Sequence, residues 1–320
     1  MQVVLFHRYF GGLTGGHLKL WDYFCHVQNI AGYQARICFS PDSTWDQTNP
    51  WLPIREKVLD KWRPEGADIW FLAGMDWNAL TVEQRTRPAV PVINLIQGVR
   101  HADPQHPLYE FLRYPAVRVC VSHPVAEALA ASGRVNGPIR VIENGIDSSR
   151  WPSPRPWAQR AYDVLICGYK QPWLGKELAS RLSRDLNVRL LTSVGPRNQF
   201  LAWLADARVA VCLPNKEEGF YLPALEAMVQ GALVVCPDCI GNRDFCQDGR
   251  TCWMPAWSVD ALEHATMEAL SASASRRQQL RQAIDQVASH HSLGRERQAF
   301  RSILMQLNEM WQQTRAVGAH

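Results

Sequence analysis

The most informative stretch of this chain is NKEEGFYLPALEAM, residues 215–228. It follows the apolar run 209–213, which predicts a buried strand, and its second half has the apolar spacing of a helix. Pro223 suits the first turn of that helix, because the N–H that proline lacks would have no partner there. We therefore expect the amide groups around Tyr221 and Leu222 to point out of the positive end of the helix. A loop and helix start of this kind predict an anion-binding site.

Two carboxylates border this helix start. Glu218 lies in the loop and Glu226 lies about one turn inside the helix, so both can line one pocket. Carboxylates accept hydrogen bonds from hydroxyl groups, which ribose and hexoses present in adjacent pairs. A phosphate at the helix end with hydroxyl-rich groups on either side describes a nucleotide sugar. Taken alone, however, two spaced glutamates favour a simpler alternative, namely acids that only complement the helix dipole.

Strand and helix patterns alternate over the whole chain. Short apolar runs predict strands at 3–6, 35–39, 68–73, 90–96, 117–121, 139–142, 164–167, 188–191, 209–213 and 233–236. Apolar residues at helical spacing predict helices at 20–31, 125–129, 174–182, 222–230, 259–270 and 278–287, and a final helix carries an apolar stripe from Phe300 to Trp311.

This alternation predicts an α/β protein with two doubly wound, Rossmann-like parallel sheets. Three prolines within residues 151–156 interrupt the pattern and predict a linker. The expected parts are residues 1–150, residues 151–295 and a C-terminal helix at 296–320. Ligands of such sheets bind beyond the carboxyl ends of the strands, so we expect the site in a cleft between the two domains.

The composition is that of an ordinary globular protein. Of its 320 residues, 47% are hydrophobic and 20% charged, which excludes disordered and collagen-like chains. A net charge of +4 without like-charge runs does not predict a nucleic-acid binder. No apolar stretch reaches the ~18 residues of a spanning helix, and the first residues do not form a secretory signal. Nine cysteines, an odd number, are typical of free thiols in a reducing compartment. We expect a cytoplasmic protein, with peripheral contact to the inner face of the membrane left open.

The run from Glu218 to Met228 resembles the E-x7-E signature of retaining GT-B glycosyltransferases, family 4 and its relatives. That signature commonly reads E-G-F-G-L-P-x-L-E-A-M, and this chain departs from it once, with Tyr221 where glycine is usual. The segment VIENGID at 141–147 resembles the one that precedes the family's second domain. The resemblance covers most of the chain and is strongest from about residue 141 to residue 255. It implies a GT-B fold in which residues 1–150 form the acceptor-side domain and residues 151–295 bind the nucleotide sugar. The last helix, 296–320, is expected to cross back to the first domain.

The resemblance implies a role for each matching residue of the signature. Glu218 is the expected catalytic residue, because the first glutamate of the family faces the hydroxyls of the donor sugar. Glu226 is expected to hold the ribose hydroxyls. The diphosphate is expected to bind the backbone between them, at Gly219, Phe220, Tyr221 and Leu222.

The basic residues for the diphosphate are less well defined. Related enzymes carry an arginine and a lysine in a G-R-x4-K-G context, where this chain has GYKQPWLGK at 168–176. Tyr169 stands at the arginine position and Leu174 at the lysine position. We expect Lys170 to be the main cation that binds the diphosphate and Lys176 to be the second. The alternative is that either residue is a solvated lysine at a helix end.

The first half of the chain contributes weaker candidates. Gly15 and Gly16 resemble the glycine pair that follows the first strand of the family and are expected to bind the donor. Gln97 and His101 follow the predicted strand 90–96. Related enzymes often place a histidine near the sugar in this region, so we assign His101 to catalysis and Gln97 to the donor. An equally good interpretation is that Gln97 and His101 are ordinary loop residues.

No metal or other cofactor is expected. Cys236 and Cys239 invite comparison with a zinc site, but Cys246 and Cys252 lack the tight spacing of a second ligand pair. Small apolar packing is the preferred interpretation of these thiols. The sequence contains no D-x-D pair, the usual metal–diphosphate motif of the other glycosyltransferase fold.

These observations favour a retaining, metal-independent glycosyltransferase. It would move a sugar from a nucleotide-diphosphate donor to a hydroxyl of a glycan, a lipid-linked saccharide or a small molecule. One alternative is a nucleotide-sugar epimerase on the same scaffold, although we find no cluster of acid–base groups for it. The other is a non-catalytic subunit that binds a carbohydrate or nucleotide sugar, which the departures at Tyr169 and Tyr221 make conceivable.

Overall fold

The computed structural model describes residues 1–317, with side chains described up to Thr314. The chain divides into two compact units. Unit 1 consists of Met1–Gly145 together with the C-terminal segment that begins at Leu293, and unit 2 is Ile146–Ser292. The chain changes unit at 145/146 and 292/293, whereas the sequence placed the boundaries at 150/151 and 295/296. Unit 2 is one continuous stretch inserted into unit 1.

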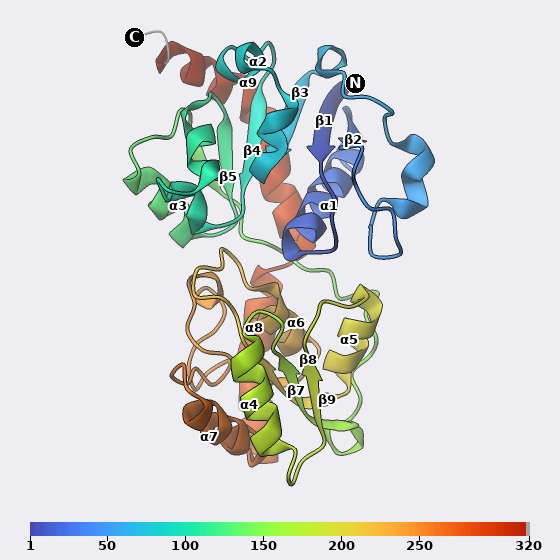
Figure 1. The fold of residues 1–320 in the computed structure, drawn as a ribbon, viewed down its shortest axis with the longest axis vertical. Helices are drawn as coiled ribbons and strands as arrows, with labels where there is room; N and C mark the ends of the chain where they lie inside the picture. Colours follow the sequence, from blue (N-terminus) through green and yellow to red (C-terminus); the bar gives the residue numbers. More distant parts are fainter. Residues whose placement is uncertain (318–320) are drawn as a thin grey trace. The chain divides into compact units, whose positions relative to one another are not determined.

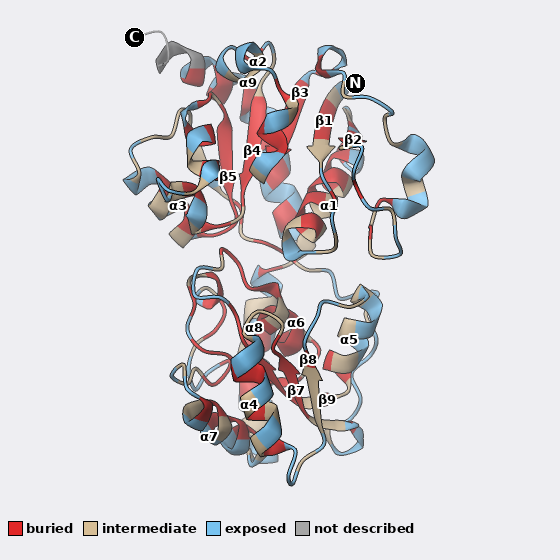
Figure 2. Cartoon of the chain, in the orientation of Figure 1, coloured by how far each residue is buried: buried red, intermediate tan, exposed pale blue. Residues whose placement is uncertain are grey.

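Unit 1 is built on a six-stranded parallel sheet with the strand order β2-β1-β3-β4-β5-β6 (Figure 1). Its strands are β1 (Gln2–Arg8), β2 (Tyr33–Phe39), β3 (Ile69–Ala73), β4 (Val92–Ile96), β5 (Val117–Cys120) and β6 (Ile139–Val141). All residues of β3 and β4 are buried, which explains why the central strands form continuous apolar runs (Figure 2). Because β2 and β3 lie on opposite sides of β1, the sheet has its topological switch point between β1 and β3.

The helices of unit 1 cover this sheet and include the C-terminal one. They are α1 (Gly15–Gln28), α2 (Val82–Thr86), α3 (His123–Ala131) and α9 (Leu293–Val317), with short 3-10 helices η1 (Leu52–Lys57), η2 (Pro64–Gly66), η3 (Gly74–Ala79), η4 (Val99–Ala102) and η5 (Pro107–Arg113). The ring of Phe300 in α9 lies 4.8 Å from that of Tyr23 in α1 and 5.8 Å from that of Phe71 in β3. The last helix therefore returns to the first unit, as predicted, and Figure 1 shows it beside α1.

A buried ionic cluster joins α1 to α9. Lys19 Nζ lies 2.6 Å from a carboxylate oxygen of Glu296 and 2.7 Å from Asp22. Glu296 also contacts His26 at 2.9 Å and accepts the Gly145 N–H at 2.5 Å. Burial opposes the charge of Glu296, but Lys19 and His26 outweigh it and hold the pKa of this carboxyl below its usual value. The cluster thus fixes the last residue of the first segment to the start of the returning helix.

Unit 2 has a four-stranded parallel sheet with the order β10-β9-β7-β8. Its strands are β7 (Tyr162–Cys167), β8 (Val188–Leu191), β9 (Ala207–Cys212) and β10 (Leu233–Val235). Its helices are α4 (Pro172–Leu182), α5 (Arg197–Ala205), α6 (Leu222–Val229), α7 (Val259–Leu270) and α8 (Ala274–His290), with 3-10 helices η6 (Trp157–Gln159) and η7 (Ile240–Asn242). The sequence predicted each of these strands but missed α5. Among the described residues of the chain, no helix is long and apolar enough to cross a membrane.

Candidate functional site

The loop between β9 and α6 is held in place by η7. The Ile240 N–H donates to the Lys216 carbonyl at 3.1 Å, which ties the two segments together. Asn242 is fully buried and shapes η7 from within, because its side-chain oxygen accepts the Cys239 N–H and its amide donates to the Pro237 carbonyl. The loop that carries the signature is therefore positioned by a turn some twenty residues later in the chain.

Gly241 makes the closest approach to this loop. A Cβ at that position would lie 2.7 Å from the Glu218 carbonyl oxygen and 2.7 Å from the Phe220 nitrogen, so only glycine fits. The Tyr221 N–H donates to the Gly241 carbonyl at 2.7 Å, and the Leu222 N–H faces the Phe220 carbonyl at 3.2 Å. The expectation that the amides of Tyr221 and Leu222 point freely out of the helix is therefore wrong. In this structure the protein itself accepts both hydrogen bonds.

The first glutamate of the signature is paired with the lysine expected to bind phosphate. Lys170 follows β7, and its ammonium donates to a carboxylate oxygen of Glu218. Both side chains retain some solvent exposure, 30% for Lys170 and 17% for Glu218. The same ammonium lies 5.4 Å from the centre of the Tyr221 ring. The carboxyl end of β7 and the signature loop thus bring together three of the predicted residues.

The second glutamate is buried and has a partner that the sequence did not suggest. Glu226 is only 1% exposed, and its carboxylate lies 2.5 Å from Arg197 Nη2. Arg197 begins α5, directly after Gly195 and Pro196, and its guanidinium stacks 5.5 Å from the Trp151 ring. No sequence signal identifies it, because Arg197 begins a helix that the sequence pattern does not predict.

Two tyrosines lie among these charges. Tyr221 is fully buried, and its hydroxyl has no hydrogen-bond partner among the described residues. Burial raises the pKa of Tyr169, and the nearby Cys167 and Glu226 raise it further. Burial likewise raises the pKa of Tyr221, followed by the influence of Tyr169. Both phenols are therefore neutral at physiological pH, and the position usually held by arginine carries a neutral group.

Lys176 and Leu174 have different surroundings. Leu174 stands at the usual lysine position but belongs to the hydrophobic core of unit 2. Lys176 lies exposed on α4, and no hydrogen bond or ion pair between described residues joins it to the other predicted site residues. Of the two lysines, only Lys170 contacts the signature.

In unit 1, the second glycine of the pair, Gly16, contacts Gln97. Gly15 and Gly16 open α1, and Gln97 follows β4 and donates to the Gly16 carbonyl at 3.3 Å. A Cβ on Gly16 would lie 3.3 Å from the Gln97 side-chain oxygen, which favours glycine there. His101 lies in η4 and is only 4% exposed. Burial, assisted by Arg100, lowers the pKa of His101 to about 3, so this histidine is neutral.

The cysteines of the described part of the chain are not grouped as metal ligands. Among the residues that the structure describes, no group of three or more His, Cys, Asp or Glu side chains is arranged to hold a metal ion. All nine cysteines are free, and eight of them are buried. Burial raises the pKa of Cys246, which contacts Cys236 and Cys252.

Comparisons with known proteins agree with this architecture. Residues 152–272 match the sequence profile of the family described as "Glycosyl transferases group 1". No curated protein matches the chain.

Several solved structures resemble the whole chain. HepE of Anabaena, solved with UDP-glucose, superimposes with a TM-score of 0.74 at 14% identity and covers 96% of this chain and 100% of its own. Sucrose-phosphate synthase of Thermosynechococcus elongatus gives 0.72 at 14% identity, with 97% and 100% covered. The lipopolysaccharide outer core galactosyltransferase WaaB gives 0.64 at 13% identity, with 95% and 99% covered.

The predicted fold class is therefore confirmed: the chain has the GT-B fold. The likeness to these structures shows the fold alone. The family match covers residues 152–272 of unit 2, less than half of the chain, and supports a glycosyltransferase domain there.

Proposed function

We propose that this protein is a retaining, metal-independent glycosyltransferase that uses a nucleotide-diphosphate sugar. Its acceptor is a hydroxyl of a glycan, a lipid-linked saccharide or a small molecule. The observation that supports this most strongly is the pair of ionic contacts at the start of α6, Lys170 with Glu218 and Arg197 with Glu226. Lys170 from the loop after β7 and Arg197 from the start of α5 meet the two carboxylates of the signature. Such a set of charges suits a ligand that carries both phosphates and hydroxyls.

The four side chains can exchange partners when such a ligand binds. A diphosphate offers Lys170 and Arg197 a stronger anionic partner than a carboxylate does. Each carboxylate is then free to accept hydrogen bonds from hydroxyls, Glu218 from the sugar and Glu226 from the ribose. The ion pairs keep the charges neutralised until then, which avoids leaving the buried Glu226 without a partner.

The two cations also fit the chemistry of transfer. The bond between the anomeric carbon and the diphosphate oxygen breaks, the acceptor oxygen forms the new bond to that carbon, and the proton of the acceptor hydroxyl passes to the leaving diphosphate. Negative charge grows on the leaving diphosphate, where a fixed cation such as Lys170 stabilises it. Retention of configuration rests on the resemblance to retaining enzymes. The use of protein cations for the leaving group supports a reaction without a metal.

The first experiment is a thermal-shift panel of UDP-, GDP-, ADP- and dTDP-sugars. A ligand at 100 times its Kd stabilises the folded state by about 2.7 kcal/mol. Since HepE was solved with UDP-glucose, a UDP-sugar is the first choice. Transfer is then measured with EDTA present, and the anomeric configuration of the product is read by NMR. A product of inverted configuration, or activity that EDTA abolishes, contradicts the proposal.

The tyrosines favour a second candidate, a subunit that binds a nucleotide sugar without turnover. Tyr169 is neutral where arginine is usual, and Tyr221 adds a buried ring where glycine is usual. Nucleotide-sugar binding without product from a cell-extract acceptor pool would favour this candidate over transfer. Epimer formed from the donor alone would favour an epimerase.

We place the enzyme in the cytoplasm, where nucleotide sugars are the donors available to it, and expect no nucleic-acid partner. The net charge of +4 also allows peripheral contact with an anionic membrane surface. Cell fractionation with a salt wash distinguishes the two states, because an electrostatic contact is released by salt.

A further inference from the structure

The ammonium of Lys170 has a second partner besides the Glu218 carboxylate. Its nitrogen lies over the ring of Tyr221, 5.4 Å from the ring centre. This is within the ~6 Å over which the face of an aromatic ring attracts a cation. Both partners belong to the segment that leads into α6, whereas Lys170 follows β7. The lysine is thus placed by two groups of different chemistry, one charged and one neutral.

The Tyr221 ring is a fixed surface for this cation. Tyr221 is 1% exposed and precedes the first residue of α6, and its N–H is held by the Gly241 carbonyl at 2.7 Å. Burial raises the pKa of Tyr221, so its phenol stays neutral and forms no ion pair with the lysine. Its hydroxyl has no hydrogen-bond partner among the described residues. What this side chain offers to Lys170 is therefore the face of its ring.

The two partners of Lys170 behave differently when a ligand binds. In the proposed partner exchange, Glu218 turns to the hydroxyls of the sugar and leaves the lysine. A lysine without an anchor regains the rotamer freedom of its four-carbon stem, and a bound phosphate must restrict that freedom again. A neutral ring neither leaves with the sugar nor competes for the three N–H donors of the ammonium. The ring contact is thus the one that can persist while the diphosphate binds.

We propose that the Tyr221 ring is a positioning residue for the cation of the diphosphate site: it holds the Lys170 ammonium in place when Glu218 releases it. The inference rests on the proposed function for the identity of the ligand. It also gives a role to the departure from the signature at Tyr221. Since Tyr169 replaces the usual arginine, the site depends on this single lysine after β7, and the ring keeps it aligned.

The first test follows the lysine itself, in the full-length protein with lysine labelled with ¹³C at Cε. A ring face displaces the Lys170 Cε protons upfield from those of the exposed Lys176, and the resonance is identified by its absence in Lys170→Gln. Glu218→Gln imitates the release of the lysine without any ligand. Most of the displacement should persist in Glu218→Gln. Its loss there would show that the carboxylate alone places the lysine, and overturns the inference.

Two changes at residue 221 separate the ring from the rest of the side chain. Tyr221→Phe keeps the ring and removes a buried hydroxyl that has no described partner, so it is the conservative variant. Tyr221→Leu keeps an apolar side chain and removes the ring. The upfield displacement should be retained in Tyr221→Phe and lost in Tyr221→Leu. If Tyr221→Leu does not fold, the measurement on Glu218→Gln still decides, because it leaves residue 221 as it is.

The second test measures the affinity for inorganic pyrophosphate by titration calorimetry, which requires no choice of base or sugar. Pyrophosphate should bind Tyr221→Leu about fivefold more weakly than Tyr221→Phe, the range of one ring–cation contact. With Lys170→Gln added to both, the difference should disappear. A double-mutant cycle of this kind isolates the coupling between the ring and the lysine. An equal difference in both backgrounds would mean that the ring only supports the loop, and overturns the inference.

The control is another ring–cation pair of unit 2. Trp157 lies under Arg277 at 4.5 Å, and no described hydrogen bond, ion pair or ring contact joins it to residues 215–228. Trp157→Leu and Trp157→Phe should bind pyrophosphate equally. A fivefold difference between them would show that any lost ring in unit 2 weakens binding, and overturns the inference.

The inference and the proposed function fail separately. If no nucleotide sugar of the panel binds while the lysine resonance and pyrophosphate behave as expected, the proposed function is wrong and the role of the ring stands. If nucleotide-sugar transfer is observed but Tyr221→Leu and Tyr221→Phe agree in both tests, the inference alone is overturned.

Discussion

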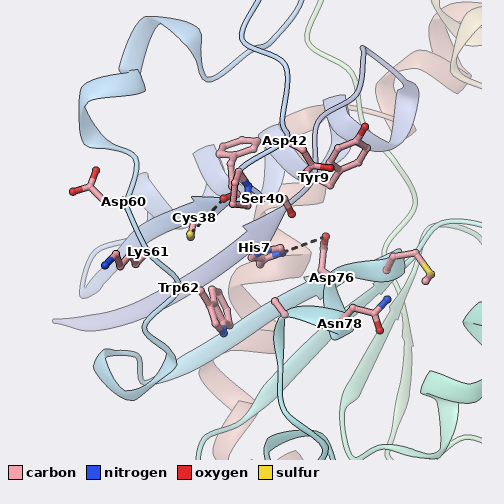
Figure 3. A pocket seen from close by; sticks show the side chains of 14 residues that line it. His7, Tyr9, Cys38, Ser40, Asp42, Asp60, Lys61, Trp62, Asp76 and Asn78 are labelled. Atoms are coloured by element: carbon pink, nitrogen blue, oxygen red, sulfur yellow. Dashed lines mark hydrogen bonds and ion pairs between the residues drawn. The ribbon is translucent and has the colours of Figure 1, made fainter.

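The two units differ in how their buried polar groups are partnered. In unit 2, each carboxylate of the signature already contacts a cation, Glu218 with Lys170 and Glu226 with Arg197. In unit 1, His7 Nδ1 has only a longer ion pair with Asp76, at 3.8 Å, and Trp62 Nε1 is buried without a hydrogen-bond partner among the described residues (Figure 3). A site with paired charges suits an anionic ligand that replaces one partner of each pair. Atoms as inaccessible as these two are not open to a ligand, so they bear on the packing of unit 1 rather than on binding.

The largest effect that tests this difference is expected from Glu218→Gln. The change removes the negative charge beside the reacting sugar and keeps the shape of the side chain. We expect kcat to fall about 10²–10³-fold, the usual effect of losing one electrostatic group at a reacting centre. Steady-state kinetics with the best nucleotide sugar of the panel measure it. Glu217→Gln is the matched control, because Glu217 is the exposed neighbour, and an equal loss in both variants would contradict the role of Glu218.

The second largest effect concerns unit 1 alone. Arg118 is fully buried, and its guanidinium donates to the Asn94 side chain and to the Phe111, Leu112 and Tyr114 carbonyls. Burial lowers the pKa of Arg118 to about 9. Arg118→Lys cannot reach all four acceptors and should lower the free energy of unfolding by about 2–4 kcal/mol.

Urea unfolding measures this loss, and the exposed Arg140→Lys is the control. The nucleotide-sugar thermal shift reports on unit 2 and should persist in folded Arg118→Lys. If Arg118→Lys lost nucleotide-sugar binding as well as stability, the site in unit 2 would depend on the folding of unit 1.

Glu226→Gln should weaken donor binding more than it slows transfer. The carboxylate is expected to hold the ribose, and hydrogen bonds to a charged group contribute about 1.5–3 kcal/mol, which corresponds to roughly 10- to 100-fold in Kd. Titration calorimetry with the nucleotide sugar measures the change. The exposed Glu268→Gln on α7 is the control. Unchanged Kd in Glu226→Gln would show that Arg197 and Glu226 only hold α5 against α6.

The smallest effect is a pH dependence that belongs to unit 1. The pKa of His101 is lowered to about 3 by burial, below the value of about 6.5 in an unfolded chain. Below pH 6.5 the unfolded state therefore binds a proton that the folded state does not. This contribution is fully present above pH 6.5 and is lost as the pH falls, by about 1.4 kcal/mol per pH unit between pH 6 and pH 4. The free energy of unfolding, measured in urea between pH 6 and pH 4, should fall less steeply with falling pH in His101→Gln than in the exposed His264→Gln of unit 2. Equal slopes would contradict this prediction.

Most of the fold could be predicted because parallel strands buried on both faces form continuous apolar runs. The run at 92–96 is an example, since all five residues of β4 are buried. Helix α5 escaped prediction because only three of its nine residues, Leu201, Leu204 and Ala205, are buried, and its first turn is polar. The amphipathic pattern there is too weak to be seen in a single sequence.

The candidate site was predictable where one stretch of sequence carries it and not where distant segments meet. Glu218 and Glu226 lie in one motif, and Lys170 follows a strand that ends at the same edge of the sheet. Arg197 contacts Glu226 across a separate loop, so no spacing in the sequence reveals it. The amide of Tyr221 was misassigned for the same reason, because its partner, Gly241, comes from a later turn. A cavity in unit 1 likewise combines the ends of β1 and β2, loop residues and η3, which are far apart in the sequence.

The way unit 2 joins the rest of the chain has a practical consequence for engineering. Its two ends meet, because the Ile146 N–H donates to the His291 carbonyl at 2.9 Å, and on the other side of the junction Gly145 is hydrogen-bonded to Glu296. Residues 146–292 are therefore a cassette with adjoining ends. We expect chimeras that exchange this cassette between related enzymes to change the donor and keep the acceptor. Both junctions would lie beside backbone groups that are already fixed by hydrogen bonds.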